Sequence, residues 1–247
     1  MIRTLNVAAF AAMVAVNILA NALPLNGQTT GAISDRYPVL FTPAGYVFAI
    51  WGVIYLCLAA FVVYQARVHE WDVYAGRIGH LFILSCALNS AWIFAWHFDL
   101  LALSTLIIVG LLLTLISLYL RLAPPPDGQV LAWQERWLVK APFSLYLGWI
   151  SVATIANVSI LLYSAGWQRW GLSDVTWTVT MMVVAAVLAI VMGKREGDFI
   201  FVLVVAWALA GIGVRHDAVA EIAFVAWVLA GILAVLVLVL RMRRQSV

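Results

Sequence analysis

Charged side chains are scarce in this sequence. Only 10% of its 247 residues are Asp, Glu, Lys or Arg, and 66% are hydrophobic, whereas soluble domains carry about 25% charged residues. The mean hydropathy of +1.05 excludes a soluble globular protein. The 14 basic and 11 acidic residues are scattered along the chain rather than gathered in one patch, which excludes a nucleic-acid-binding domain.

Reactive and metal-binding groups are also rare. Cys57 and Cys86 both fall inside apolar runs, so we expect two buried thiols rather than a disulfide or a zinc site. The histidines lack metal-ligand spacing, and no Ser/His/Asp arrangement or phosphate-binding glycine loop is present. Lys140 and Lys194 lie at the ends of apolar runs, so no lysine within the membrane could carry a retinal Schiff base. We therefore predict no metal ligand and no catalytic residue.

Long apolar runs are abundant instead. A membrane-spanning helix needs about 20 apolar residues, and the sequence predicts eight of them, over about 4–24, 43–66, 78–98, 100–122, 137–163, 175–193, 198–215 and 218–240. With a cytoplasmic N-terminus, all but three of the 14 Lys and Arg residues fall on the cytoplasmic side, as the positive-inside rule requires. We predict an all-α membrane protein with eight spans and both termini in the cytoplasm.

The first apolar segment has two interpretations. Ala20-Asn21-Ala22 has the small-x-small form of a signal-peptidase site. Asn17 and Asn21, four residues apart, share one helix face, which favours a retained helix packed against its neighbours.

The third predicted helix has two distinct faces. Asn89, Trp92 and Trp96 follow the spacing i, i+3, i+7 and lie on one face. Small residues form a stripe on roughly the opposite face, where a second helix could approach closely: Ala87, Ala91 and Ala95. The first face predicts a pocket lining and the second a helix contact, although tryptophans can also fill a bundle and alanines are ordinary helix formers.

The fifth and second predicted helices carry similar faces. Four residues of the fifth align within a narrow arc: Tyr146, Trp149, Ala153 and Asn157. Trp51 and Tyr55 share a face of the second helix. A buried amide or indole N–H needs a hydrogen-bond partner in an apolar medium, so their alignment indicates a shared cavity.

Three segments together resemble the TspO/MBR family of tryptophan-rich sensory proteins, or translocator proteins. They are Pro43–Tyr55 (PAGYVFAIWGVIY), Ala87–Trp92 (ALNSAW) and Tyr146–Asn157 (YLGWISVATIAN). The resemblance covers about residues 1–165 and implies a five-helix transmembrane core, with residues 166–247 as a three-helix extension. Ala44, Tyr46 and Leu145 stand where the family pattern has proline, tryptophan and proline, so the rim of the site is expected to differ.

The resemblance implies an apolar pocket beneath the loop that joins the first two helices. Family members bind porphyrins and other flat apolar ligands, sterols among them, and often form dimers. Carried over, the ligand-binding residues are Trp51, Tyr55, Asn89, Trp92, Tyr146, Trp149, Ala153 and Asn157. The loop 25–42 would be a lid, with Asp35 and Arg36 as the charged groups that clamp it or meet a ligand carboxylate.

We therefore expect a multi-pass receptor or carrier in a bacterial cytoplasmic membrane. Its ligand would be a porphyrin- or haem-like tetrapyrrole or a sterol, and two copies could form a homodimer. One alternative is an enzyme that degrades porphyrin under light through Trp51 and Trp149. A second is a structural or regulatory protein whose C-terminal helices dock a partner, with Gly211, Gly213 and Gly231 permitting close helix contacts.

Overall fold

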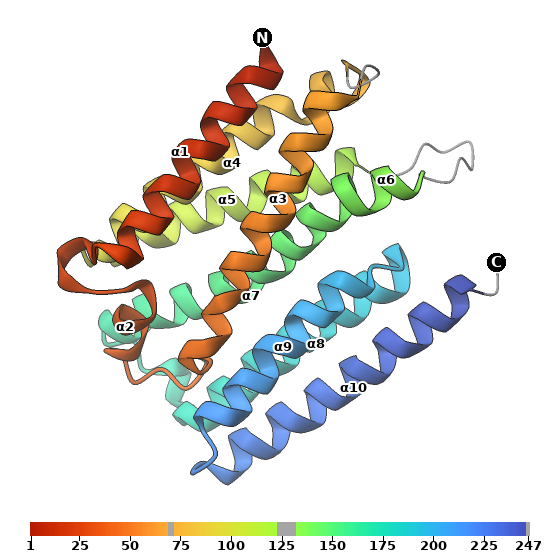
Figure 1. The fold of residues 1–247 in the computed structure, drawn as a ribbon. Helices are drawn as coiled ribbons and strands as arrows, with labels where there is room; N and C mark the ends of the chain where they lie inside the picture. The colour runs from red at the N-terminus through yellow and green to blue at the C-terminus, as the bar shows by residue number, and fades with distance from the viewer. Residues whose placement is uncertain (69–71, 123–131, 246–247) are drawn as a thin grey trace. The chain divides into compact units, whose positions relative to one another are not determined.

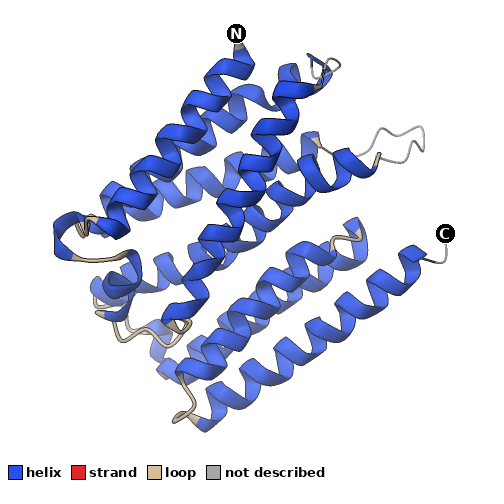
Figure 2. Cartoon of the chain, in the orientation of Figure 1, coloured by secondary structure: helices blue, strands red, loops and turns tan. Residues whose placement is uncertain are grey.

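The structure is a computed structural model that describes residues 1–68, 72–122 and 132–245. Within these ranges the regular elements are all helices (Figures 1 and 2), which confirms the all-α prediction. Eight helices of the described chain are long: α1 (Ile2–Ala22), α3 (Ile50–Arg67), α4 (Asp72–His97), α5 (Leu101–Arg121), α7 (Ala141–Ser164), α8 (Asp174–Glu196), α9 (Phe199–Arg215) and α10 (Ala220–Gln245).

Seven helices of the described chain are long and apolar enough to cross a membrane. The eighth, α9, is apolar but has only 17 residues. At 1.5 Å per residue it extends about 25 Å, near the lower limit for a span.

Local chemistry sets the helix ends. The turn between α8 and α9 uses Gly197 at a φ of 60°, a left-handed conformation that favours glycine. The next residue, Asp198, caps α9 by accepting hydrogen bonds from the backbone N–H groups of Ile200 and Phe201, both at 3.1 Å. Only Phe98, Asp99 and Leu100 separate α4 from α5, and these two helices pack against each other, which confirms the hairpin that the short link predicts.

The described chain divides into two compact units. The first comprises residues 1–33 and 50–147, in which α1 packs on α3 and α4, and α4 packs on α5. Three phenylalanine rings form part of its core, with centroids 4.9–5.9 Å apart: Phe61, Phe82 and Phe143. All three rings are fully buried, so aromatic packing closes this part of the unit.

The second unit comprises residues 34–49 and 148–247. Helices α8, α9 and α10 pack against one another, and small residues allow the close approach. A Cβ on Gly193 would lie 2.9 Å from Val202 Cγ2, and one on Gly213 would lie 3.0 Å from Trp227 Nε1. A Cβ on Gly231 would meet nothing within 4 Å, so Gly231 makes no close contact within the described chain, and docking of a partner there stays a prediction.

Several boundaries differ from those predicted. Helix α4 begins at Asp72 rather than near 78, because the helix continues into a polar turn beyond its apolar part. The predicted loop 25–42 contains two short helical turns, η1 (Leu25–Gly27) and α2 (Thr30–Asp35). The compact units meet at Leu147 and Gly148, within α7, so the division at residue 165 into a core and an extension stays a prediction.

Candidate functional site

A hydrogen-bond chain of neutral side chains runs through the first unit. Asn17 on α1 donates through Nδ2 to Asn89 Oδ1 on α4, at 2.7 Å. Asn89 in turn donates through Nδ2 to the Tyr146 hydroxyl on α7, at 2.8 Å. These three side chains are 5%, 0% and 0% exposed. Because a buried amide is costly unless it is paired, this chain fixes α1 and α7 on either side of α4.

Four aromatic rings surround this chain. On α3, Trp51 stacks on Tyr55, with ring centroids 5.7 Å apart and planes at 20°. On α4, Trp92 stacks on Trp96 at 5.6 Å and 19°. Trp51 joins the pairs, since its ring lies 6.2 Å from Trp92 and 6.0 Å from Tyr146. We call these seven side chains the aromatic–amide cluster: Asn17, Trp51, Tyr55, Asn89, Trp92, Trp96 and Tyr146.

The cluster has two half-buried rings and one hydroxyl that makes no hydrogen bond. Trp51 and Tyr55 are intermediate in burial, whereas Trp92 is only 6% exposed. The Tyr55 hydroxyl is buried near the Asn89 amide, but it makes no hydrogen bond of normal geometry with a described residue. A buried hydroxyl with this capacity left over is a natural anchor for a polar atom of a ligand.

The structure brings together five of the predicted ligand-binding residues: Trp51, Tyr55, Asn89, Trp92 and Tyr146. Asn17 was expected only to pack α1 against a neighbour, and its bond to Asn89 places it in the site. The interpretation of residues 4–24 as a retained helix stays a prediction. Trp96, which shares the predicted face of Asn89, donates through Nε1 to the Thr30 carbonyl at 3.1 Å, and so ties the start of α2 to the cluster.

The other three predicted residues belong to the second unit. Trp149 is 2% exposed and packs edge-on against Phe48, with ring centroids 5.8 Å apart. Asn157 is 2% exposed and Ala153 is half-buried. Their convergence with the aromatic–amide cluster stays a prediction.

Residues 34–49, which we call the docked segment, are held by α9 in the second unit. Arg215 forms an ion pair with Asp35 and donates to the Pro43 carbonyl at 3.2 Å. The backbone N–H of Ala44 donates to the Gly211 carbonyl at 3.0 Å. Trp207 donates through Nε1 to the Val47 carbonyl at 3.3 Å, and its ring meets Tyr46 edge-on at 5.4 Å.

The predicted clamp residues are both on this segment. Asp35 pairs with Arg215, a partner that the sequence does not indicate because the two residues lie 180 positions apart. Its role as the clamp of a lid stays a prediction. Arg36 lies over the ring of Tyr37, with its guanidinium carbon 5.8 Å from the centroid. His216 donates through Nε2 to the Thr42 carbonyl at 3.3 Å. Burial, reinforced by the charge of Arg215, lowers the pKa of His216, which favours the neutral ring in this contact.

The comparisons with known proteins give one match. The family model described as TSPO-like protein matches residues 3–239. The chain belongs to the TSPO-like family. No curated protein and no solved structure matches it.

Membership of the TSPO-like family agrees with the segments from which the resemblance was inferred. Together with the seven apolar helices, it identifies the chain as a multi-pass membrane protein. The family match continues past residue 165 and takes in α8, α9 and most of α10. These helices are therefore part of the region that the TSPO-like family model describes.

The alanine stripe of this TSPO-like protein is mostly on the surface. Ala87 and Ala91 are exposed, whereas Ala95 is 3% exposed. A close helix contact at Ala87 and Ala91 would need a second molecule, so the homodimer stays a prediction.

Proposed function

We propose that this protein is a membrane receptor or carrier that binds a flat hydrophobic ligand, such as a porphyrin-like tetrapyrrole or a sterol, at the aromatic–amide cluster. The observation that carries the proposal is the buried chain Asn17–Asn89–Tyr146 among stacked indoles. Polar groups at membrane depth are rare and mark functional sites. The family membership supports the same interpretation.

The cluster suits binding and orientation of a planar guest. Indole and phenol faces stack on flat rings in offset geometry, and a ligand would enter at the two half-buried rings, Trp51 and Tyr55. The Tyr55 hydroxyl and the amides would orient a polar edge of the ligand. Amides and phenols are weak acids and bases, so the cluster favours binding and presentation over general acid–base chemistry.

Removing the spare hydroxyl tests the ligand site. We expect Tyr55→Phe to weaken protoporphyrin binding about fivefold, the worth of one net hydrogen bond. Quenching of tryptophan fluorescence in detergent-solubilised protein measures the affinity. Tyr64→Phe, on the same helix α3, is the control and should bind as the wild type does.

Two results would contradict the proposal: no quenching of the wild type at micromolar protoporphyrin, or an equal loss in Tyr64→Phe. Competition by a sterol shows whether both ligand classes share the site. Bleaching of bound porphyrin under light in the wild type, but not in Trp51→Phe, would instead favour the enzyme alternative.

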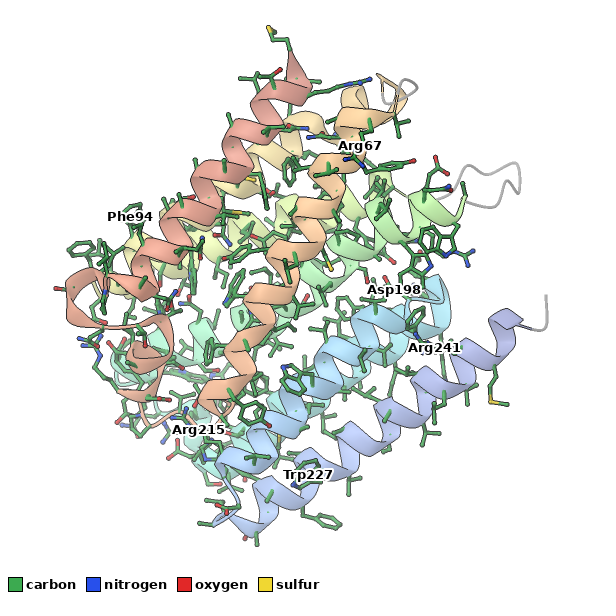
Figure 3. The ribbon with its side chains drawn as sticks, viewed as in Figure 1. Arg67, Phe94, Asp198, Arg215, Trp227 and Arg241 are labelled. Atoms are coloured by element: carbon green, nitrogen blue, oxygen red, sulfur yellow. The ribbon has the colours of Figure 1, made fainter. Side chains whose placement is uncertain are left out.

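We further propose eight spans with both termini in the cytoplasm of a bacterial cell. The shortest of these spans is α9, whose ends carry Asp198 and Arg215 (Figure 3). Charged groups at both ends of an apolar helix fit a short span better than a helix buried within the bilayer.

Reporter fusions test this topology. Alkaline phosphatase, active only outside the cytoplasm, is expected to be active when fused after Asp217 and inactive when fused after Glu196 or at the C-terminus. If α9 does not span, the fusions after Glu196 and Asp217 will both be inactive, and the C-terminal fusion will be active.

A further inference from the structure

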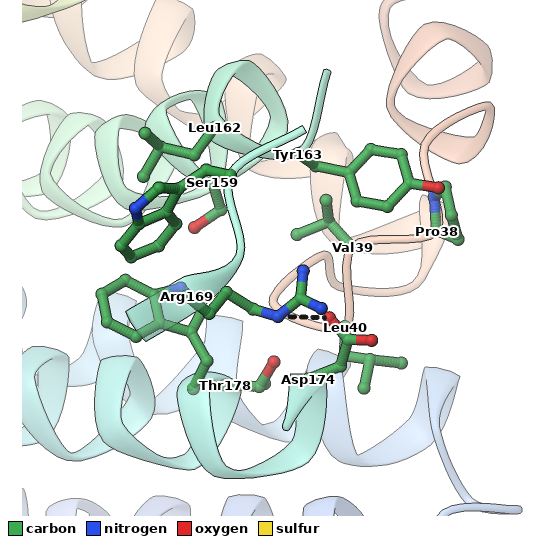
Figure 4. A pocket seen from close by; sticks show the side chains of 11 residues that line it. Pro38, Val39, Leu40, Ser159, Leu162, Tyr163, Arg169, Asp174 and Thr178 are labelled. Carbon is green, nitrogen blue, oxygen red and sulfur yellow. Dashed lines mark ion pairs between the residues drawn. The ribbon is translucent and has the colours of Figure 1, made fainter. Parts of the chain in front are cut away.

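The second unit contains a cavity that the proposed function does not use. It lies between the docked segment, the end of α7 and the start of α8, and encloses about 340 Å³ of empty space, open solvent at its mouth included (Figure 4). Much of this space is open to solvent, so the cavity is a shallow recess that could hold only a compact polar group lying against its wall. The lining residues that matter here are Leu40, Leu162, Trp167, Arg169, Asp174 and Trp177.

Aromatic rings form one corner of this cavity. Trp167 and Trp177 meet at 80°, with ring centroids 4.9 Å apart. Trp170, which is 81% exposed, lies against both, at 5.3 Å and 6.1 Å. Tryptophans gathered at the end of one apolar helix and the start of the next are typical of the headgroup level of a membrane, and their faces attract ammonium groups.

An ion pair crosses the floor of the cavity. Arg169 Nε lies 3.1 Å from Asp174 Oδ1 and also donates to the Leu172 carbonyl at 3.4 Å. The pair is made through Nε, and Figure 4 shows one of the two terminal nitrogens pointing toward Val39. The terminal nitrogens of a guanidinium can donate to phosphate oxygens.

The carboxylate complements the guanidinium. The Asp174 side chain is 57% exposed and that of Arg169 is 27% exposed, so Asp174 can meet a cation while Arg169 meets an anion. The backbone presents the pair in a fixed turn, since Arg169 and Trp170 both have a φ of 53°. Positive φ at two successive residues other than glycine is unfavourable and is usually retained at functional positions.

We propose that this cavity binds the zwitterionic headgroup of a phospholipid. The phosphate lies on the terminal nitrogens of Arg169, and the ammonium lies between Asp174 and the indole faces. Leu40 and Leu162 give an apolar wall for the start of an acyl chain. This lipid site is independent of the ligand site in the aromatic–amide cluster.

Native mass spectrometry of the purified protein tests this site. We expect phosphatidylethanolamine to bind at least tenfold more tightly than diacylglycerol, which lacks the headgroup. Arg169→Gln should weaken the binding of phosphatidylethanolamine about tenfold. Asp174→Asn should weaken the binding of phosphatidylethanolamine and strengthen the binding of anionic phosphatidylglycerol, because the carboxylate that repels the anionic lipid is gone. This reversal of preference is not expected from a merely structural role.

The control is Arg195→Gln, at the exposed opposite end of α8, which should bind all three lipids as the wild type does. Equal losses in Arg195→Gln and Arg169→Gln, or no preference for phosphatidylethanolamine over diacylglycerol, would overturn the proposal. Displacement of the lipid by soluble phosphoethanolamine at equal concentration would assign the site to a free zwitterion rather than a lipid. Protoporphyrin quenching should be unchanged in all three variants, which separates this test from that of the ligand site.

Discussion

Asn89→Leu is expected to destabilise the protein by about 2 kcal/mol and to weaken protoporphyrin binding more than tenfold. Leucine has the same number and branching of side-chain heavy atoms as asparagine, but it removes the acceptor of Asn17 and the donor to Tyr146 together. Hydrogen bonds between membrane helices contribute roughly 0.6–1.7 kcal/mol each, and stranding a buried partner adds a desolvation cost. An SDS unfolding titration and the quenching assay measure the two effects.

Removing the partners as well separates a lost hydrogen bond from poor packing. The triple variant Asn17→Leu, Asn89→Leu and Tyr146→Phe removes every side-chain polar group of the hydrogen-bond chain. No member of it is left buried without a partner, so the triple variant should be more stable than Asn89→Leu alone. Asn21→Leu is the control, because Asn21 bonds to the Asn17 carbonyl and not to the Asn89 side chain. If the triple variant is less stable than the single one, the hydrogen-bond chain does not explain the loss.

Gly211→Ala is expected to lower the free energy of unfolding by about 3 kcal/mol, which is at the upper end for overpacking in a core. The added Cβ would lie 2.2 Å from Val47 Cγ2 and 3.2 Å from Pro43 Cβ. It would therefore push the docked segment away from α9, where the Gly211 carbonyl accepts the hydrogen bond of Ala44. The SDS titration measures the loss, and faster proteolysis within residues 34–49 would locate it.

A second substitution tests whether the clash is the cause. Val47→Ala removes the methyl group that a new Cβ would strike, so the pair Gly211→Ala and Val47→Ala should be more stable than Gly211→Ala alone. Gly231→Ala is the matched control, since nothing lies within 4 Å of the added carbon and alanine favours a helix. A loss of stability in Gly231→Ala as large as that in Gly211→Ala would contradict the steric explanation.

The sequence predicted the features that depend on local pattern. Apolar runs about 20 residues long located every long helix, because the backbone groups of a membrane span must form their hydrogen bonds within the helix. Helical spacing placed Asn89 and Trp92 on one face, and the structure joins that face to Trp51 and Tyr146. Of the two amides of α1, Asn17 packs against a neighbouring helix as predicted, whereas Asn21 is exposed and bonds to the Asn17 carbonyl of its own helix. Spacing on one helix does not show which helix lies opposite.

Features that depend on distant partners were not predicted. The pair of Asp35 and Arg215 joins the ends of two helices, α2 and α9, that share no pattern in the sequence. The close approach at Gly211 could be guessed only as one of several small residues, and Gly231 shows that the same residue type in the next helix has no such contact. The early start of α4 at Asp72 was missed because hydropathy marks the apolar part of a helix and not its polar first turns.

The docking of residues 34–49 on α9 also constrains the order of events during synthesis. Val47 and Trp207, which share a hydrogen bond, are 160 residues apart. At roughly 5–20 residues per second, Val47 leaves the ribosome about ten to thirty seconds before its partner. Throughout that interval residues 34–49 lack their contacts with α9, so this segment can complete its docking only after α9 has been made.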